Sequence, residues 1–116
     1  MATTGERDFR FGLTANAVDF LGAAAQEMAS EGGKNLKYAT LHLVDGIELL
    51  LMARLAKESW YLLFPDIDKA DEAMLDKGDF QSVGLDTTLS RLENLAKVQL
   101  SDADIKVIKG LRTIRN

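Results

Sequence analysis

A single proline, Pro65, and the lack of any alternating strand pattern most constrain what this chain can fold into. Apolar residues recur at the i, i+3, i+4, i+7 spacing, which places them on one side of an α-helix. Proline breaks helices more strongly than any other residue, so one proline leaves long stretches open to helix formation. The sequence therefore predicts an all-α protein, an antiparallel helical bundle of four main helices.

Capping and breaking signals set the expected limits of these helices. The four predicted ranges are residues 14–30, 35–64, 87–97 and 101–116. Gly32-Gly33 is expected to end the first helix, Asn35 to cap the second, and Pro65 to end it. Ser101 followed by Asp104 matches the Ser-x-x-acid signal that begins a helix. The second helix is apolar around most of its circumference, which predicts that it is the central, buried element.

The stretch over residues 66–84 has a different composition. It is rich in Asp and Lys, contains Gly78 and Gly84, and is interpreted as an irregular excursion between the second and third helices. A short helical piece is expected over residues 69–75. Phe80 and Val83 are expected to attach the end of this excursion to the core.

Helical spacing also predicts which side chains face inward. The predicted inward positions outside the central helix are Ala17, Phe20, Leu21, Ala24, Ala25, Met28, Leu85, Leu89, Leu92, Leu95, Ile105, Ile108, Leu111 and Ile114. The alanines of the first helix are small, and small side chains allow two helix axes to approach closely. We therefore expect the first two helices to pack tightly against one another.

Composition limits the domain count and the classes of function. A chain of 116 residues with 47% hydrophobic residues forms one domain, residues 1–116, with a core of its own. A net charge of −4 argues against a broad basic face for nucleic acid, but it leaves room for a small local basic site. The sequence has no cysteine, signal peptide or apolar stretch long enough to span a bilayer, which indicates a cytoplasmic protein without membrane contact.

Glu48 is the most unusual residue of the predicted central helix. It stands between Ile47 and Leu49 within an apolar run, where an unpaired carboxylate would cost several kcal/mol. A cation of the last helix, Arg112 or Arg115, is its natural partner. A structural ion pair and a functional carboxylate both fit this pattern.

His42 is the only histidine, and Asp45 follows it at the i+3 position of the same predicted helix. A His with nearby carboxylates can bind a metal ion or act as an acid–base group. One histidine without further metal-ligand spacing favours a structural role, with a hydrogen bond to Asp45 or to the backbone. No metal and no cofactor are therefore expected.

Basic residues gather on the last predicted helix. Lys109 and Arg112 are i, i+3 neighbours, with Lys106 before them and Arg115 after them. Cations near a helix C-terminus compensate the helix dipole. The same cations also suit an anion such as an RNA phosphate, to which Arg is well matched in shape. Both interpretations remain open at this point.

Two segments together resemble the HEPN superfamily of small bacterial and archaeal helical domains. They are residues 38–64, the long helix with Glu48, and residues 108–116, which end in Arg115-Asn116. Members of this family resemble one another in an inward acid on a long helix and in a last helix with the pattern Arg-x4–6-His, often beginning Arg-Asn. The resemblance implies a metal-independent endoribonuclease, or an inactive relative, of toxin–antitoxin, phage-defence or stress systems, working as a homodimer.

The same resemblance implies roles for individual residues. Arg115 would stabilise the scissile phosphate, Asn116 would orient it, and Glu48 would hold Arg115 in place. The family's His would be the acid–base group for attack by the 2′-hydroxyl, because proton transfer needs a group that titrates near neutral pH. No His follows Arg115 in this sequence, and His42 lies on another predicted helix. The sequence is therefore expected either to stop before this His or to belong to a non-catalytic member.

Two functional hypotheses follow. The first is a domain for RNA cleavage or RNA binding, catalytically incomplete as given, with Arg112 and Lys109 as further anion-binding residues. The second is a non-catalytic dimerisation or partner-binding module, such as an immunity or regulatory subunit that binds a cognate antitoxin or a regulatory protein. The acidic charge, the missing His and the bulky group Trp60, Tyr61 and Phe64 favour the second hypothesis.

Overall fold

The computed structural model describes residues 4–29, 36–77 and 80–115, and every regular element in these ranges is helical. The α-helices and 3₁₀ helices (η) are α1 (Thr4–Ala29), α2 (Leu36–Glu58), η1 (Trp60–Leu63), η2 (Ile67–Lys69), α3 (Glu72–Lys77), α4 (Leu85–Asn94) and α5 (Asp102–Arg115). The all-α prediction is confirmed.

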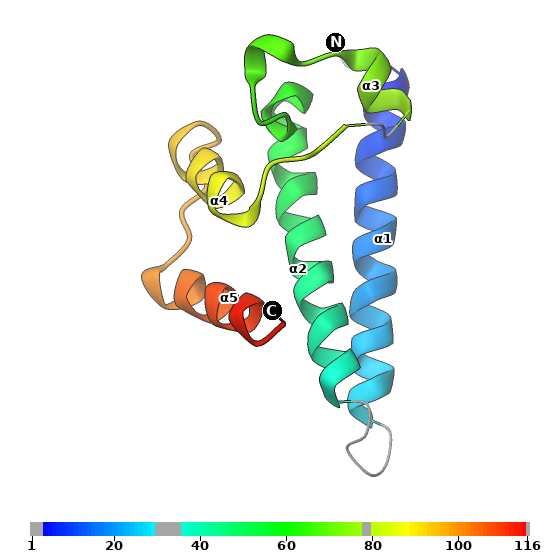
Figure 1. Ribbon diagram of the computed structural model, residues 1–116, viewed down its shortest axis with the longest axis vertical. Coiled ribbons are helices and arrows are strands. Elements are labelled where there is room, and N and C mark those ends of the chain that lie inside the picture. Colours follow the sequence, from blue (N-terminus) through cyan, green and yellow to red (C-terminus); the bar gives the residue numbers. More distant parts are fainter. Residues whose placement is uncertain (1–3, 30–35, 78–79, 116) are drawn as a thin grey trace.

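A long helical hairpin forms the frame of the molecule. Helices α1 and α2 run side by side in opposite directions along its longest dimension (Figure 1). Helices α4 and α5 pack on α2, on the side away from α1, while α3 packs on α1. The predicted four-helix bundle is not confirmed, because α5 runs across α2 in place of extending the hairpin as a parallel layer (Figure 1).

The first two helices differ from their predicted limits. Helix α1 already begins at Thr4, ten residues before the predicted start. Helix α2 ends at Glu58, because Ser59 is extended and the chain continues as η1. Phe64 is also extended, because a proline disfavours the helical conformation in the residue before it. The predicted stop at Gly32-Gly33 and the cap at Asn35 lie outside the described residues.

The later elements follow the predicted order with shifted limits. The excursion contains η2 and α3 where one short helical piece was expected over residues 69–75. Helix α4 lies two to three residues earlier than predicted, and the chain leaves it through Lys97, which has a φ of 58°. The predicted start of α5 is confirmed, since the Asp104 amide donates a hydrogen bond to Ser101 Oγ at 3.0 Å.

The core lies where α2, η1 and α4 meet the start of α1. Its buried residues are Leu13, Leu55, Ala56, Leu62, Leu63, Leu92 and Ala96. Phe80 and Val83 attach the excursion as predicted: the Phe80 ring stacks on Phe64 at 4.4 Å between centroids, and Val83 is buried. The inward predictions were wrong for three large side chains, which are at least half exposed: Met28, Leu95 and Ile114.

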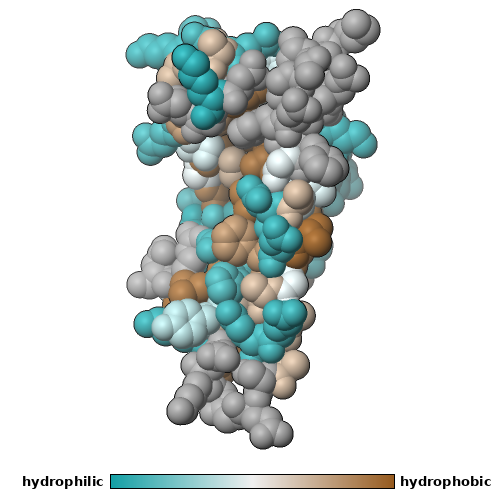
Figure 2. Space-filling model, turned by 90° about the vertical axis from the view of Figure 1, so that its right-hand side faces the viewer, coloured by the Kyte–Doolittle hydropathy of each residue, from teal (hydrophilic) through white to brown (hydrophobic). Residues whose placement is uncertain are grey.

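The two hairpin helices touch most closely at Gly46 of α2. A Cβ atom built on Gly46 would lie 2.8 Å from Cγ and Cδ2 of Leu21 and 3.2 Å from the Ala17 carbonyl oxygen. Ala17 and Ala24 of α1 are buried as predicted, whereas Ala25, also predicted to face inward, is exposed. The face of the molecule that Figure 2 shows carries interspersed hydrophilic and apolar residues.

Replacing Gly46 by Ala tests this close approach. We expect Gly46→Ala to lower the free energy of unfolding by up to about 2 kcal/mol, because overpacking costs about 1–3 kcal/mol and the helix-propensity gain returns about 1 kcal/mol of it. Gly22→Ala is the matched control: Gly22 lies in α1 with no atom within 4 Å of its added Cβ, and it should stabilise. Urea denaturation followed by circular dichroism measures both. Equal stabilisation by the two variants would contradict the close approach.

Arg91 of α4 holds the end of η1 through backbone contacts. Its Nη1 donates hydrogen bonds to the carbonyl oxygens of Leu62 at 2.6 Å and Phe64 at 2.7 Å, and its Nη2 donates to that of Pro65 at 3.0 Å. The fork of a guanidinium group can satisfy several acceptors at once, whereas an ammonium group cannot reproduce this geometry. Arg91 thus fixes the turn after η1 to α4.

We expect Arg91→Met to lower the free energy of unfolding by about 2 kcal/mol. Hydrogen bonds to charged groups contribute about 1.5–3 kcal/mol, and the substitution leaves partly buried carbonyls without these donors. Arg54→Met serves as the control, because the ion pair described for Arg54 is with Glu58, one turn along α2, at 3.6 Å and with both side chains more than 40% exposed. This control should change stability by less than about 0.5 kcal/mol. Thermal or urea unfolding measures the stability of both variants. Equal stability of Arg91→Met and Arg54→Met would show that the Arg91 contacts are dispensable.

Candidate functional site

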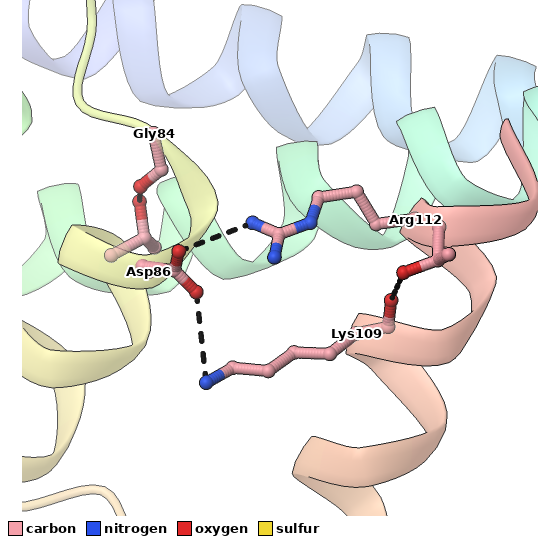
Figure 3. Close-up of polar contacts among 6 residues, drawn as sticks. Gly84, Asp86, Lys109 and Arg112 are labelled. Carbon is pink, nitrogen blue, oxygen red and sulfur yellow. Dashed lines mark hydrogen bonds and ion pairs between the residues drawn. The ribbon is translucent and has the colours of Figure 1, made fainter. Parts of the chain in front are cut away.

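Two of the four basic residues predicted on the last helix, Lys109 and Arg112, converge on one carboxylate of α4. Lys109 Nζ lies 3.6 Å from Asp86 Oδ1, and Arg112 Nη1 lies 3.5 Å from Asp86 Oδ2. Figure 3 shows both side chains extending from α5 toward the first turn of α4, where Asp86 lies. The two cations and Asp86 together form what we call the α4–α5 ion cluster.

Local rules explain how the chain builds this cluster. Lys109 and Arg112 are one turn apart in α5, so their side chains leave the helix on neighbouring positions of one face. Asp86 stands in the first turn of α4, where a negative charge is favoured by the positive end of the helix dipole. The Ser101 cap fixes where α5 begins, and hence which of its residues turn toward α4.

The α4–α5 ion cluster carries one net positive charge, because two cations share a single carboxylate. Side-chain exposure is 28% for Arg112, 47% for Lys109 and 67% for Asp86, so water and salt reach all three groups. Both N···O separations exceed the value of about 2.7–2.9 Å for charge-assisted hydrogen bonds. The arrangement of two cations around one exposed carboxylate is suited to binding an anion.

Glu48 lies on α2 and is half buried. Helix α5 packs on α2 and ends at Arg115, one turn after Arg112. The side chain of Arg115 and the whole of Asn116 lie outside the described part of the structure, so the predicted contact between Glu48 and Arg115 stays a prediction. The other predicted partner of Glu48, Arg112, forms its ion pair with Asp86.

His42 connects the two hairpin helices. Its Nδ1 lies 2.9 Å from Glu27 Oε2 of α1, and its ring lies 5.6 Å from the Phe20 ring between centroids. The sequence predicts a partner on the same helix or in the backbone, whereas the described hydrogen bond of His42 crosses to Glu27 of α1. Among the described residues no group of three or more His, Cys, Asp or Glu side chains could hold a metal ion. The described contacts of His42 therefore join α2 to α1.

An apolar depression lies beside the end of α5. It has a volume of about 300 Å³ and is lined by Leu36, Lys37, Thr40, Leu41 and Ile114. Leu36 and Ile114 are 62% and 70% exposed, although the spacing of α5 predicted that Ile114 faces inward. The residues that sequence reasoning missed are therefore those of this depression on α2, together with Asp86.

Comparisons of the chain with protein-family models, with curated proteins and with solved structures found no match. Within the described residues no helix combines the length and the apolar character needed to cross a membrane. The described features that bear on function are the α4–α5 ion cluster, Glu48 and the apolar depression.

Proposed function

We propose that this chain is a HEPN-like helical domain that binds RNA through the basic face of α5. The observation that carries the proposal is that Lys109 and Arg112 both reach Asp86, so that two cations lie close together on the surface. Arg112 is one turn before Arg115 in α5. A second support is the half-buried carboxylate of Glu48 on α2, the helix against which α5 packs. An acid on a long helix and an Arg on the last helix are the elements on which the resemblance rests.

Phosphate chemistry explains why these residues suit RNA. Arg and Lys neutralise backbone phosphates, and this sequence-independent attraction dominates nucleic-acid affinity at moderate salt. A chain with a net charge of −4 repels a polyanion over most of its surface, which restricts contact to a local basic site. A small cluster on α5 therefore predicts a short contact with a few phosphates of single-stranded RNA.

In this proposal Arg115 stabilises the phosphate that is closest to the end of α5, Asn116 orients it, and Glu48 holds Arg115. Cleavage also requires the His that the family places after its Arg, beyond Asn116. RNA binding is accordingly the activity proposed for residues 1–116. Cleavage, if present, belongs to a protein that supplies this His, and Arg115→Ala should abolish it there while the fold is retained.

RNA binding can be measured with a fluorescein-labelled, single-stranded oligoribonucleotide by anisotropy over a range of salt concentrations. We expect the double variant Lys109→Ala/Arg112→Ala to bind about tenfold more weakly, because roughly 0.7 kcal/mol is lost for each of two phosphate contacts. The slope of log K against log salt should fall by about 0.7 for each contact removed.

The matched control removes two positive charges elsewhere. In Arg54→Ala/Lys57→Ala both residues lie on α2 near its C-terminus, and the net charge changes by the same amount. This control should keep the salt slope of the original chain. If both double variants bind alike, or if the original chain binds no RNA, the proposed RNA site on α5 is wrong.

The apolar depression supports a second candidate function, a non-catalytic module that binds a second copy of the chain or a regulatory protein. An exposed Ile114 next to exposed Leu36 is the kind of apolar surface that commonly marks a protein interface. This candidate uses the end of α5 and the start of α2, and it does not require Lys109 or Arg112.

Sedimentation equilibrium separates this candidate from RNA binding. If the depression mediates self-association, the chain should be dimeric, and Ile114→Asp should weaken the dimer at least tenfold, because burying an unpaired carboxylate is costly. Val107→Asp is the control: Val107 is another exposed aliphatic residue of α5, and it does not line the depression. A monomer at all concentrations would rule out the homodimer.

A further inference from the structure

The α4–α5 ion cluster already contains an anion, the Asp86 carboxylate. Asp86 Oδ1 faces Lys109 Nζ at 3.6 Å and Asp86 Oδ2 faces Arg112 Nη1 at 3.5 Å (Figure 3). Each oxygen of the carboxylate is thus directed at a different cation. Two oxygens of a backbone phosphate present negative charge in a similar way, and Arg and Lys bind carboxylates and phosphates with the same groups.

The two ion pairs of Asp86 are weak enough for another anion to replace its carboxylate. Its side chain is 67% exposed, and both cations are separated from it by more than a hydrogen-bond distance. Ion pairs of this type contribute little net free energy, since water and salt compete for each partner. An incoming phosphate that makes closer contacts with the same two cations can therefore replace the carboxylate without disturbing a buried group.

The position of Asp86 adds a structural consequence to this exchange. Helices α4 and α5 each pack on α2, while the described ion pairs between α4 and α5 are those of Asp86. The buried residues of α4, such as Leu89 and Leu92, do not take part in the cluster. Exchange of Asp86 for a phosphate would therefore release an ionic link between the two helices and leave the core intact.

We propose that Asp86 is an intramolecular competitor that occupies the phosphate site of Lys109 and Arg112 until RNA displaces it. This inference rests on the proposed RNA binding by α5. RNA then binds only to molecules in which Asp86 has left Lys109 and Arg112. The apparent dissociation constant for RNA equals the intrinsic one divided by the fraction of such molecules, so a smaller fraction means weaker binding. The competition lowers affinity and restricts binding to ligands that can offer phosphates to both cations.

The test compares Asp86→Asn with the original chain in the same anisotropy titrations at about physiological ionic strength. Asn keeps the size of the side chain and removes its charge. Asp86→Asn should bind the oligoribonucleotide about two- to sixfold more tightly, the range that corresponds to the loss of a surface ion-pair network. Because Asp86 is exposed and outside the core, circular dichroism should show an unchanged helical content.

Two controls separate competition from a general change in charge. Glu93→Gln removes a negative charge from the same helix, seven residues and about 10 Å farther along α4, beyond the screening length of about 8 Å. It should change affinity less than about 1.5-fold at this ionic strength. In the Lys109→Ala/Arg112→Ala background, Asp86→Asn should give no gain, because the site for which it competes is absent.

Each outcome decides between the proposals. A gain with Asp86→Asn that exceeds that of Glu93→Gln and disappears in the double-alanine background supports competition by Asp86. Equal gains for the two acids, no gain, or weaker binding of Asp86→Asn overturn the competition while RNA binding through α5 stands. If neither the original chain nor Asp86→Asn binds RNA, the proposed function fails and the competition fails with it.

Discussion

The close approach of α1 and α2 at Gly46 is the constraint on which the rest of the structure depends. With no Cβ at this position, the side chain of Leu21 and the backbone of Ala17 can lie directly against α2. The other elements then attach to one of the two hairpin helices: α4, α5 and η1 to α2, and α3 to α1. A wider separation of the hairpin would move α4 and α5 relative to α1, and it would remove the surface that covers Ala17 and Ala24.

Helical periodicity predicts faces better than it predicts partners. Leu85, Leu89 and Leu92 are buried as their spacing indicates, yet Leu95 is half exposed because α4 ends at Asn94. Helical spacing also places Met28 and Ile114 on the inward faces of their helices. Both side chains are exposed, because no described element covers the end of α1 or the end of α5. The early start of α1 was also missed. The sequence of residues 4–8 is polar and gives no helix signal, whereas the structure packs α1 against α3 and buries Leu13.

Two of the three charged residues of the α4–α5 ion cluster were predictable from the sequence. The spacing of Lys109 and Arg112 in one helix indicates a shared basic face, but it says nothing about Asp86, which lies more than twenty residues away in α4. The same holds for Glu27 opposite His42 and for the carbonyls held by Arg91, which come from distant segments. Local spacing records which residues share a helix face. The partner on a neighbouring helix depends on how the helices pack, and a single sequence does not reveal that packing.

Helix α5 is held in two physically different ways, and this difference separates its structural role from the role that we propose for it. Ile105, Ile108 and Leu111 are half buried where α5 packs on α2, a contact that is insensitive to salt. Lys109 and Arg112 reach the other way to a carboxylate that water and ions also reach. In the proposed exchange, an incoming anion would replace the second contact and leave the first unchanged. Because the apolar contact keeps α5 in place, the proposal requires no unfolding of the domain when Lys109 and Arg112 change partners.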